Sequence, residues 1–119
     1  MNPSFGDTET VVRHHLQTFV EQQGLDAILD DYSTDACFLS EGRAYCGKPA
    51  IREFFDAFIA GLPAQAIAEF TLRSLRVQGG LAYITWSAGP ELPFGTDTFV
   101  VRQGRIVAQT FAMVAPPAN

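Results

Sequence analysis

Basic side chains are scarce in this sequence, and lysine is almost absent. The 119 residues carry 8 lysines and arginines against 13 aspartates and glutamates, which gives a formal net charge of −5. Lys48 is the single lysine, and no run rich in lysine or arginine occurs. Binding to nucleic acid depends on clustered positive charge that neutralises phosphates. We therefore expect no nucleic-acid partner.

Long apolar runs are also lacking. No run of apolar residues approaches the length that crosses a bilayer, so we expect no membrane partner. The first ten residues, MNPSFGDTET, have neither the basic region nor the apolar region of a secretory signal. This pattern predicts a cytoplasmic protein.

Cysteine is limited to Cys37 and Cys46. Residues 36–40 and 43–47 predict a hairpin around Glu41-Gly42, which sets the two cysteines opposite each other. A cross-strand disulfide is conceivable at such a position. Because thiols stay reduced in a cytoplasm, we expect instead two buried free thiols. Two cysteines without companion histidines do not form a metal site. No glycine-rich phosphate loop occurs either, so we expect no metal and no organic cofactor.

The sequence is rich in hydrophobic and aromatic residues. Hydrophobic residues make up 47% of the chain and aromatic residues 12%, including ten phenylalanines. This composition excludes a disordered chain. A chain of this length can bury roughly two-thirds of its unfolded surface in one core. Residues 1–119 are therefore expected to form a single domain.

Hydrophobic periodicity predicts helices first and strands last. Apolar residues three and four apart predict helices over residues 7–23, over a short segment from residue 25, and over residues 49–61. Alternating or β-branched segments predict strands over residues 36–40, 43–46, 66–78, 81–89, 95–102 and 105–114. The last four form an antiparallel meander. This order indicates an α+β fold with helices packed on one face of a curved sheet.

Three phrases of the sequence resemble a known superfamily: GLDAILDDYSTDACFLSEG, CGKPAIREFFDAF and GTDTFVVRQGRIVAQTFA. They resemble the nuclear-transport-factor-2-like proteins, and among these the SnoaL-like polyketide cyclases and the ketosteroid isomerases. The resemblance implies three helices on a strongly curved, mainly antiparallel sheet that forms a cone-shaped cavity. It also implies a homodimer formed through the sheet, whose outer face is apolar in this fold. Members catalyse isomerisation, cyclisation, dehydration or epoxide hydrolysis, or only bind ligands, so the fold does not select a reaction.

The residues that ketosteroid isomerases use are mostly absent here. Those enzymes use an aspartate base, a tyrosine, and a protonated aspartate that binds the oxyanion. By the resemblance, the base position falls at Ser40, the tyrosine at Leu16 and the second aspartate at Asp97. Since two of the three parts are missing, we do not expect a 3-oxo-steroid isomerase that works by that mechanism.

Asp97 is the strongest candidate catalytic residue. It alternates in phase with Phe99 and Val101, so it shares a strand face with apolar residues. If that face lines the cavity, desolvation raises the pKa of Asp97 and suits it to acid or base work. The alternatives are an aspartate that faces solvent and one paired with an arginine.

His15 and Gln109 are the candidate partners of Asp97. His15 borders the apolar stripe of the first helix, so it is either an acid/base partner of Asp97 or a hydrogen-bonded residue at the edge of the core. Gln109 shares a face with Phe111 and Met113, which the resemblance makes the cavity side. Its amide could orient a ligand carbonyl, face a dimer partner or satisfy a backbone group.

Other candidates carry weaker signals. Ser40 has no activating base beside it, which argues against a nucleophile. Trp86 could contact a ligand, but aromatic residues at such positions are more often core. Tyr32 matches a family phrase and is interpreted as structural, and His14 is expected to face water. The predicted ligand-binding residues are Gln109, Phe99, Phe111, Met113, Leu16, Ser40 and Trp86.

Two functions remain open at this stage. One is a SnoaL-like enzyme that binds a small, largely apolar molecule with a carbonyl group and uses Asp97 and His15 as catalytic residues. The other is a module that binds a ligand or a partner without catalysis. A purely structural dimerisation domain is a third, weaker alternative.

Overall fold

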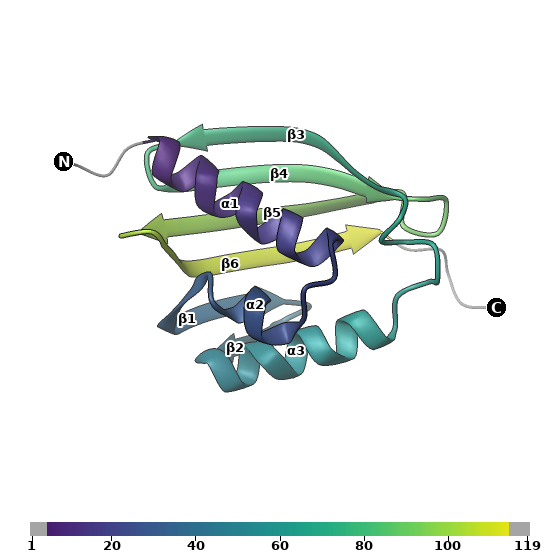
Figure 1. The fold of residues 1–119 in the computed structure, drawn as a ribbon, viewed down its shortest axis with the longest axis horizontal. Coiled ribbons are helices and arrows are strands. Elements are labelled where there is room, and N and C mark those ends of the chain that lie inside the picture. The colour runs from purple at the N-terminus through teal and green to yellow at the C-terminus, as the bar shows by residue number, and fades with distance from the viewer. Residues whose placement is uncertain (1–4, 115–119) are drawn as a thin grey trace.

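The computed structural model describes residues 5–114 and contains three helices and six strands within them (Figure 1). The helices are α1 (Phe5–Val20), α2 (Leu25–Leu29) and α3 (Lys48–Ala60). The strands are β1 (Tyr32–Ser40), β2 (Arg43–Cys46), β3 (Phe70–Gln78), β4 (Leu81–Ala88), β5 (Phe94–Arg102) and β6 (Arg105–Val114).

The six strands form one curved sheet in the order β2-β1-β6-β5-β4-β3. Strands β3 to β6 are the predicted antiparallel meander, which is confirmed. β1 runs parallel to β6, and β2 returns antiparallel beside β1 as the edge strand. This arrangement places the first strand of the chain next to the last one, so residues of β1 and β6 meet although they lie far apart in the sequence.

Two predicted strand boundaries were wrong. The strand predicted over residues 66–78 begins only at Phe70, because residues 64–69 form turns in which Ala66 N–H donates to the Pro63 carbonyl and Glu69 N–H to that of Gln65. β1 begins at Tyr32 rather than at residue 36. The polar residues at its start do not suggest a strand, but pairing of Tyr32 with Ile106 on β6 draws them into the sheet.

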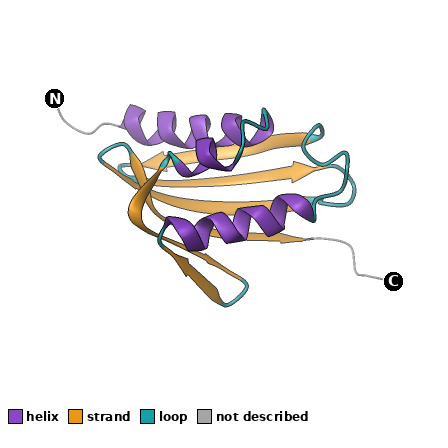
Figure 2. Cartoon of the chain, turned by 60° about the horizontal axis from the view of Figure 1, so that its bottom comes forward, coloured by secondary structure: helices purple, strands orange, loops and turns teal. Residues whose placement is uncertain are grey.

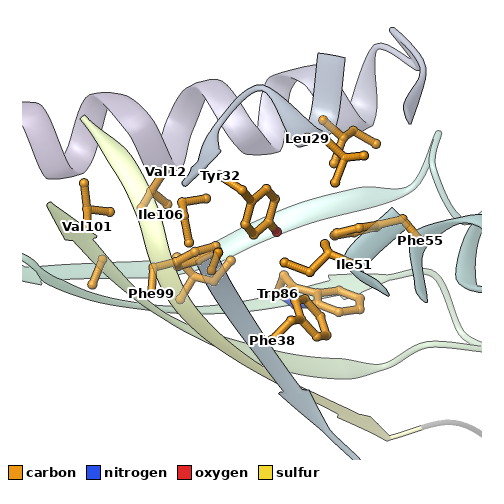
Figure 3. Packing of buried hydrophobic residues seen from close by; sticks show 14 of the residues in the cluster. Val12, Leu29, Tyr32, Phe38, Ile51, Phe55, Trp86, Phe99, Val101 and Ile106 are labelled. Atoms are coloured by element: carbon orange, nitrogen blue, oxygen red, sulfur yellow. The ribbon is translucent and has the colours of Figure 1, made fainter. Parts of the chain in front are cut away.

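The helices cover one face of the sheet (Figure 2). α1 lies against β3, β4 and β5, while α3 lies against β1 and β2. Each helix turns its apolar stripe inward: Val12 of α1 and Ile51 of α3 are fully buried. Figure 3 shows these side chains meeting Phe38, Phe99 and Ile106 from the sheet. Within the described residues, no helix is long and apolar enough to span a membrane.

The cysteines form a disulfide, so the expectation of free thiols was wrong. The predicted register is correct: Cys37 on β1 lies opposite Cys46 on β2, and the two sulfur atoms are bonded. The facing positions put the Cα atoms 4.1 Å apart. That pairing brings the two thiols within bonding reach. The bond ties the edge strand to β1, from which Phe38 enters the core.

Candidate functional site

A pocket opens between α1, α3 and the covered face of the sheet. Its empty volume is about 560 Å³, counted with the space at its mouth. Most of its wall is aromatic or aliphatic, with Phe54, Phe55 and Phe58 contributed by α3. The polar side chains in the wall are those of His15, Asp97 and Gln109. The rest of the wall is Leu16, Phe19, Phe38, Leu62, Ala66, Ile67, Phe70, Trp86, Ala88, Leu92 and Phe111.

Asp97 lies in this wall, on the predicted face of β5. Burial alternates along the strand, so that Asp97 and Phe99 point inward and Thr96 and Thr98 do not. The indole Nε1–H of Trp86 donates to Oδ1, and the amide Nε2–H of Gln109 donates to Oδ2, each at 2.8 Å. None of the salt bridges within residues 5–114 involves Asp97. The carboxyl group is therefore held by two neutral donors and not by an arginine.

Burial controls the acidity of Asp97. Desolvation raises the pKa of this carboxyl group to about 7, although the hydrogen bonds from Trp86 and Gln109 act in the opposite direction. The penalty arises because the charged form loses its hydration in an apolar wall. Asp97 therefore exchanges its proton near neutral pH, which is where acid/base catalysis is most effective.

Trp86 reaches Asp97 because the neighbouring strand carries a glycine. Gly95 is the cross-strand partner of Trp86, and the indole lies directly against it. A Cβ atom at Gly95 would lie 2.2 Å from Cε2 and Cζ2 of the indole. Phe111 stacks on the indole with an interplanar angle of 6°. Glycine at residue 95 thus permits the ring position from which Nε1–H meets the carboxylate.

Gln109 connects Asp97 to a residue that sequence reasoning assigned to the scaffold. Its Oε1 accepts a hydrogen bond of 2.5 Å from the hydroxyl of Tyr32, while its Nε2 donates to Asp97. All three side chains are buried. Tyr32 and Gln109 are 77 positions apart, and only the pairing of β1 with β6 brings them together. A buried tyrosine needs a hydrogen-bond partner for its hydroxyl. This requirement is the one indication in the sequence that Tyr32 contacts a polar residue.

His15 lies in the same wall as Asp97, but the two are not bonded. Among the hydrogen bonds of residues 5–114, none joins them. The imidazole is buried with ring-edge contacts to Tyr32, Phe55 and Phe99. Burial, and then the charge of His14, lowers the pKa of His15 to about 4. The ring is therefore neutral at pH 7.

Asp31 lies beside the two neighbouring histidines and is hydrogen-bonded to His14 only, which the sequence did not predict. Nδ1 of His14 lies 2.9 Å from one carboxylate oxygen of Asp31, and Nδ1 of His15 lies 4.0 Å from the other. The side chain of His14 is 57% exposed, so it faces water as expected while it binds Asp31. Nδ1 of His15 is buried without a hydrogen-bond partner in the described part of the chain.

The other candidates divide into those that line the pocket and those that do not. Leu16, Trp86 and Phe111 line it. Phe99 is fully buried and packs against His15, outside the pocket wall. Met113 lines a separate pocket with residues from the end of α3. The Ser40 hydroxyl donates to the backbone carbonyl of Phe111 at 3.0 Å, which is a structural bond between β1 and β6.

Metal-binding groups are not assembled here. Within residues 5–114, no cluster of three or more histidine, cysteine, aspartate or glutamate side chains could hold a metal ion.

The comparisons with known proteins identify the family. A family model described as a SnoaL-like domain matches residues 12–109, which include most of α1, both other helices and every residue of the pocket wall except Phe111. The chain belongs to the SnoaL-like domain family. A comparison with curated proteins gave no significant match.

Solved structures agree with this SnoaL-like assignment at the level of the fold. An NTF-2-like protein from Burkholderia xenovorans has a TM-score of 0.74 at 20% identity, covering 95% of this chain and 87% of that one. A SnoaL-like protein from Burkholderia thailandensis has a TM-score of 0.75 at 14% identity, covering 92% and 97%. A protein from Sinorhizobium meliloti named as a candidate polyketide cyclase has a TM-score of 0.70 at 20% identity, covering 87% and 94%. At such identities the likeness shows the SnoaL-like fold and not a shared reaction.

Proposed function

We propose that this SnoaL-like protein binds a small, largely apolar molecule with a carbonyl group and that Asp97 exchanges a proton with it. The observation that carries the proposal is the buried carboxyl group of Asp97, whose pKa is about 7, in a pocket otherwise lined by aromatic and aliphatic side chains. We infer that this pocket is the cone-shaped cavity of the family. The apolar wall favours ligands with little charge, and the few polar groups orient them.

The proposed chemistry is proton transfer next to a carbonyl. The Asp97 carboxylate takes a proton from the carbon beside the carbonyl, and the electron pair moves onto the carbonyl oxygen. Asp97 then returns a proton to the same or another carbon, so it ends in its starting state, and the proton that it holds can exchange with solvent before the return. Isomerisation, aldol-type cyclisation and dehydration can all begin with this step.

His15 is proposed as the group that donates a hydrogen bond to the carbonyl oxygen of the ligand. The imidazole is neutral at pH 7 because its pKa is lowered to about 4. A neutral imidazole N–H can donate a hydrogen bond to the oxygen where negative charge develops. Gln109 is proposed to act on Asp97 and not on the ligand, because its amide already bridges Tyr32 and Asp97.

A module that binds without catalysis is the second candidate. Both oxygens of Asp97 already accept a hydrogen bond from the protein, which is how a carboxyl group with only a structural role is held. Under this alternative the pocket binds the same class of ligand, and Asp97 exchanges no proton with it.

Ligand binding and proton exchange can be tested one after the other. A thermal-shift screen of apolar ketones and enones identifies binders, because a ligand that binds only the native state raises its stability. Each binder is then incubated with protein in D₂O, and deuterium entering beside its carbonyl is followed by NMR. We expect Asp97→Asn to slow this exchange by about 100-fold or more. Asp56→Asn, on the exposed side of α3, is the matched control.

The outcomes separate the two functions. Exchange at the wild-type rate in Asp97→Asn would remove Asp97 from the mechanism. Binding without exchange in the wild-type protein would favour the binding module. No binder in the screen would contradict the proposed ligand class.

We also propose that the protein is a homodimer formed through the face of the sheet that the helices leave uncovered. The uncharged residues that β4, β5 and β6 present on that face support this proposal.

A further inference from the structure

A buried chain of hydrogen bonds ends at Asp97 and begins at Tyr32. The Tyr32 hydroxyl donates to Oε1 of Gln109, and Nε2 of Gln109 donates to Oδ2 of Asp97. The three residues come from β1, β6 and β5, and each is less than 10% exposed. Figure 3 shows the Tyr32 ring embedded among the labelled core side chains. The proposed function uses Asp97 and Gln109 but gives Tyr32 no role.

The chemistry of the three groups fixes the direction of this chain. A carboxylate only accepts hydrogen bonds, so an ionised Asp97 requires the NH₂ end of the Gln109 amide. The carbonyl end of the amide then points away from Asp97 and needs a donor, which the Tyr32 hydroxyl supplies. In this arrangement the dipoles of the hydroxyl and of the amide both point their positive ends toward the carboxylate. Such chains polarise one another and strengthen the bond at the charged end.

We propose that Tyr32 is a positioning residue for Asp97: its hydroxyl holds the Gln109 amide with the NH₂ group toward the carboxylate and so stabilises the ionised, proton-accepting form. This inference rests on the proposed function, in which Asp97 is the group that accepts the proton. Tyr32 acts only through Gln109 and touches neither the ligand nor the carboxyl group.

Tyr32 also suits the protonated state of Asp97. A protonated Asp97 can donate to Oε1 of Gln109 once the amide has turned over, and Nε2 then donates to the hydroxyl oxygen of Tyr32. A hydroxyl group can either donate or accept, so Tyr32 completes the chain in both states. Trp86 cannot adapt in this way, because its indole N–H is only a donor. The chain can therefore reverse when Asp97 gains a proton, but the Tyr32 hydroxyl proton then loses Gln109, its acceptor in the structure, so the arrangement favours the ionised carboxylate.

Few other ionisable groups face this chain. His15 reaches the Tyr32 ring from α1, and Asp31 precedes Tyr32 in the sequence. α3 presents phenylalanines to the pocket. Burial, and then the charges of Asp97 and Asp31, raise the pKa of Tyr32 well above its usual value, so Tyr32 keeps its proton at neutral pH.

The test measures the pKa of Asp97 by ¹³C NMR of its carboxyl group, which needs no ligand. We expect Tyr32→Phe to raise this pKa by roughly half a unit to one unit, because hydrogen bonds to charged groups are the stronger ones. Tyr83→Phe is the matched control, since Tyr83 is 42% exposed on β4. A pKa of Asp97 that is the same in Tyr32→Phe as in the wild type would overturn the proposal.

A double-mutant cycle tests whether Tyr32 acts through Gln109. Gln109→Met keeps the length of the side chain and removes the amide, so we expect it to raise the pKa of Asp97 as well. In the Gln109→Met background, Tyr32→Phe should add nothing. A further shift in that background would show that Tyr32 acts directly on Asp97, which would overturn the proposed route.

The wild-type protein provides a measurement if Tyr32→Phe fails to fold. The side-chain NH₂ resonances of Gln109 should change with the same midpoint pH as the Asp97 carboxyl resonance, because the amide turns over with the proton. Resonances that stay constant through that midpoint would overturn the proposal. The deuterium-exchange assay is independent of these readouts. A shifted pKa without exchange in the wild type would refute the proposed function and leave the role of Tyr32 standing.

Discussion

Two ionisable residues in the pocket have pKa values displaced in opposite directions. Burial raises the pKa of Asp97 from 3.8 to about 7 and lowers the pKa of His15 from 6.5 to about 4. The physical cause is the same, because the charged form of either residue loses hydration. At a pH between these two pKa values, the side chains of Asp97 and His15 are both neutral. The pocket wall is thus nearly free of charge in mildly acidic solution, which suits an apolar ligand.

These displaced pKa values predict opposite effects on stability. The folded state holds the Asp97 proton up to about pH 7, so the stability from Asp97 is full below its unfolded pKa of 3.8 and is lost as the pH rises through 7. The stability from His15 is full above its unfolded pKa of 6.5 and is lost as the pH falls through 4. In the wild-type protein the two contributions offset each other between pH 4 and 6.5.

Single substitutions should expose each contribution. Asp97→Asn removes the contribution of Asp97 and keeps that of His15, so we expect the free energy of unfolding to increase from pH 4 to pH 6.5. His15→Gln removes the contribution of His15 and keeps that of Asp97, so we expect the free energy of unfolding to decrease from pH 4 to pH 7. Each change is roughly 3 to 4 kcal/mol at most. Urea denaturation at several pH values measures the effect, with the wild type as reference. Parallel profiles for all three proteins would contradict the prediction.

At the scale of the element, the pair of strands β4 and β5 holds the site together. Trp86 lies on β4 and Gly95 opposite it on β5, and the absence of a side chain at Gly95 leaves room for the indole. Asp97 follows two residues later on the same inward face. The register of these strands therefore sets both the position of the carboxyl group and that of one of its donors.

Gly95→Ala should disturb the site without adding a charge. The new methyl group would overlap the indole, so Trp86 must move and its hydrogen bond to Asp97 is lost. We expect a further rise in the pKa of Asp97 and a loss of about 1 to 3 kcal/mol in the free energy of unfolding. ¹³C NMR reports the pKa, and fluorescence reports the displacement because Trp86 is the single tryptophan.

Gly61→Ala is the matched control for this change. A Cβ atom there would lie 3.5 Å from the Ala57 carbonyl oxygen, which is an ordinary contact, and the φ of Gly61 is −92°. We expect the fluorescence and the Asp97 pKa of Gly61→Ala to match the wild type. If Gly95→Ala also kept both wild-type values, Gly95 would have no part in placing the indole.

At the scale of the whole molecule, the uncovered face of the sheet is the most distinctive surface. On this face β4, β5 and β6 contribute three cross-strand rows of uncharged residues, and Arg76 of β3 lies beside Tyr83 at the end of the middle row. The three rows are Leu81, Val100 and Ala108; Tyr83, Thr98 and Thr110; and Thr85, Thr96 and Ala112. These rows are suited to packing against a second copy of the chain, because none of their side chains carries a charge that would lose its hydration.

The homodimer can be tested by light scattering. We expect a mass of about twice the 13.0 kDa of one chain. Tyr83→Glu places a charge in the middle row and should reduce the mass to that of one chain. Thr10→Glu is the control, since Thr10 is exposed on α1, which covers the other face of the sheet. A wild-type mass of one chain would refute the dimer.

The sequence by itself determined the elements, the meander and the inward position of Asp97. These features depend on periodicity and turn residues, which are local. The alternation of Asp97 with Phe99 is visible in the sequence because strand side chains alternate by geometry alone. The register of Cys37 with Cys46 was also predictable, since a short hairpin fixes it.

Only the tertiary structure decided what surrounds Asp97. The Tyr32 hydroxyl reaches Gln109 because β1 joins the sheet parallel to β6, and Asp31 meets His14 and His15 because β1 begins beneath α1. The two hydrogen bonds among these contacts, Asp31 with His14 and Tyr32 with Gln109, join residues that are 17 and 77 positions apart. No local pattern encodes them, because they depend on how separate elements pack and on how much water that packing removes. The same burial sets the pKa values of Asp97 and His15, which are properties of the folded pocket and not of the chain.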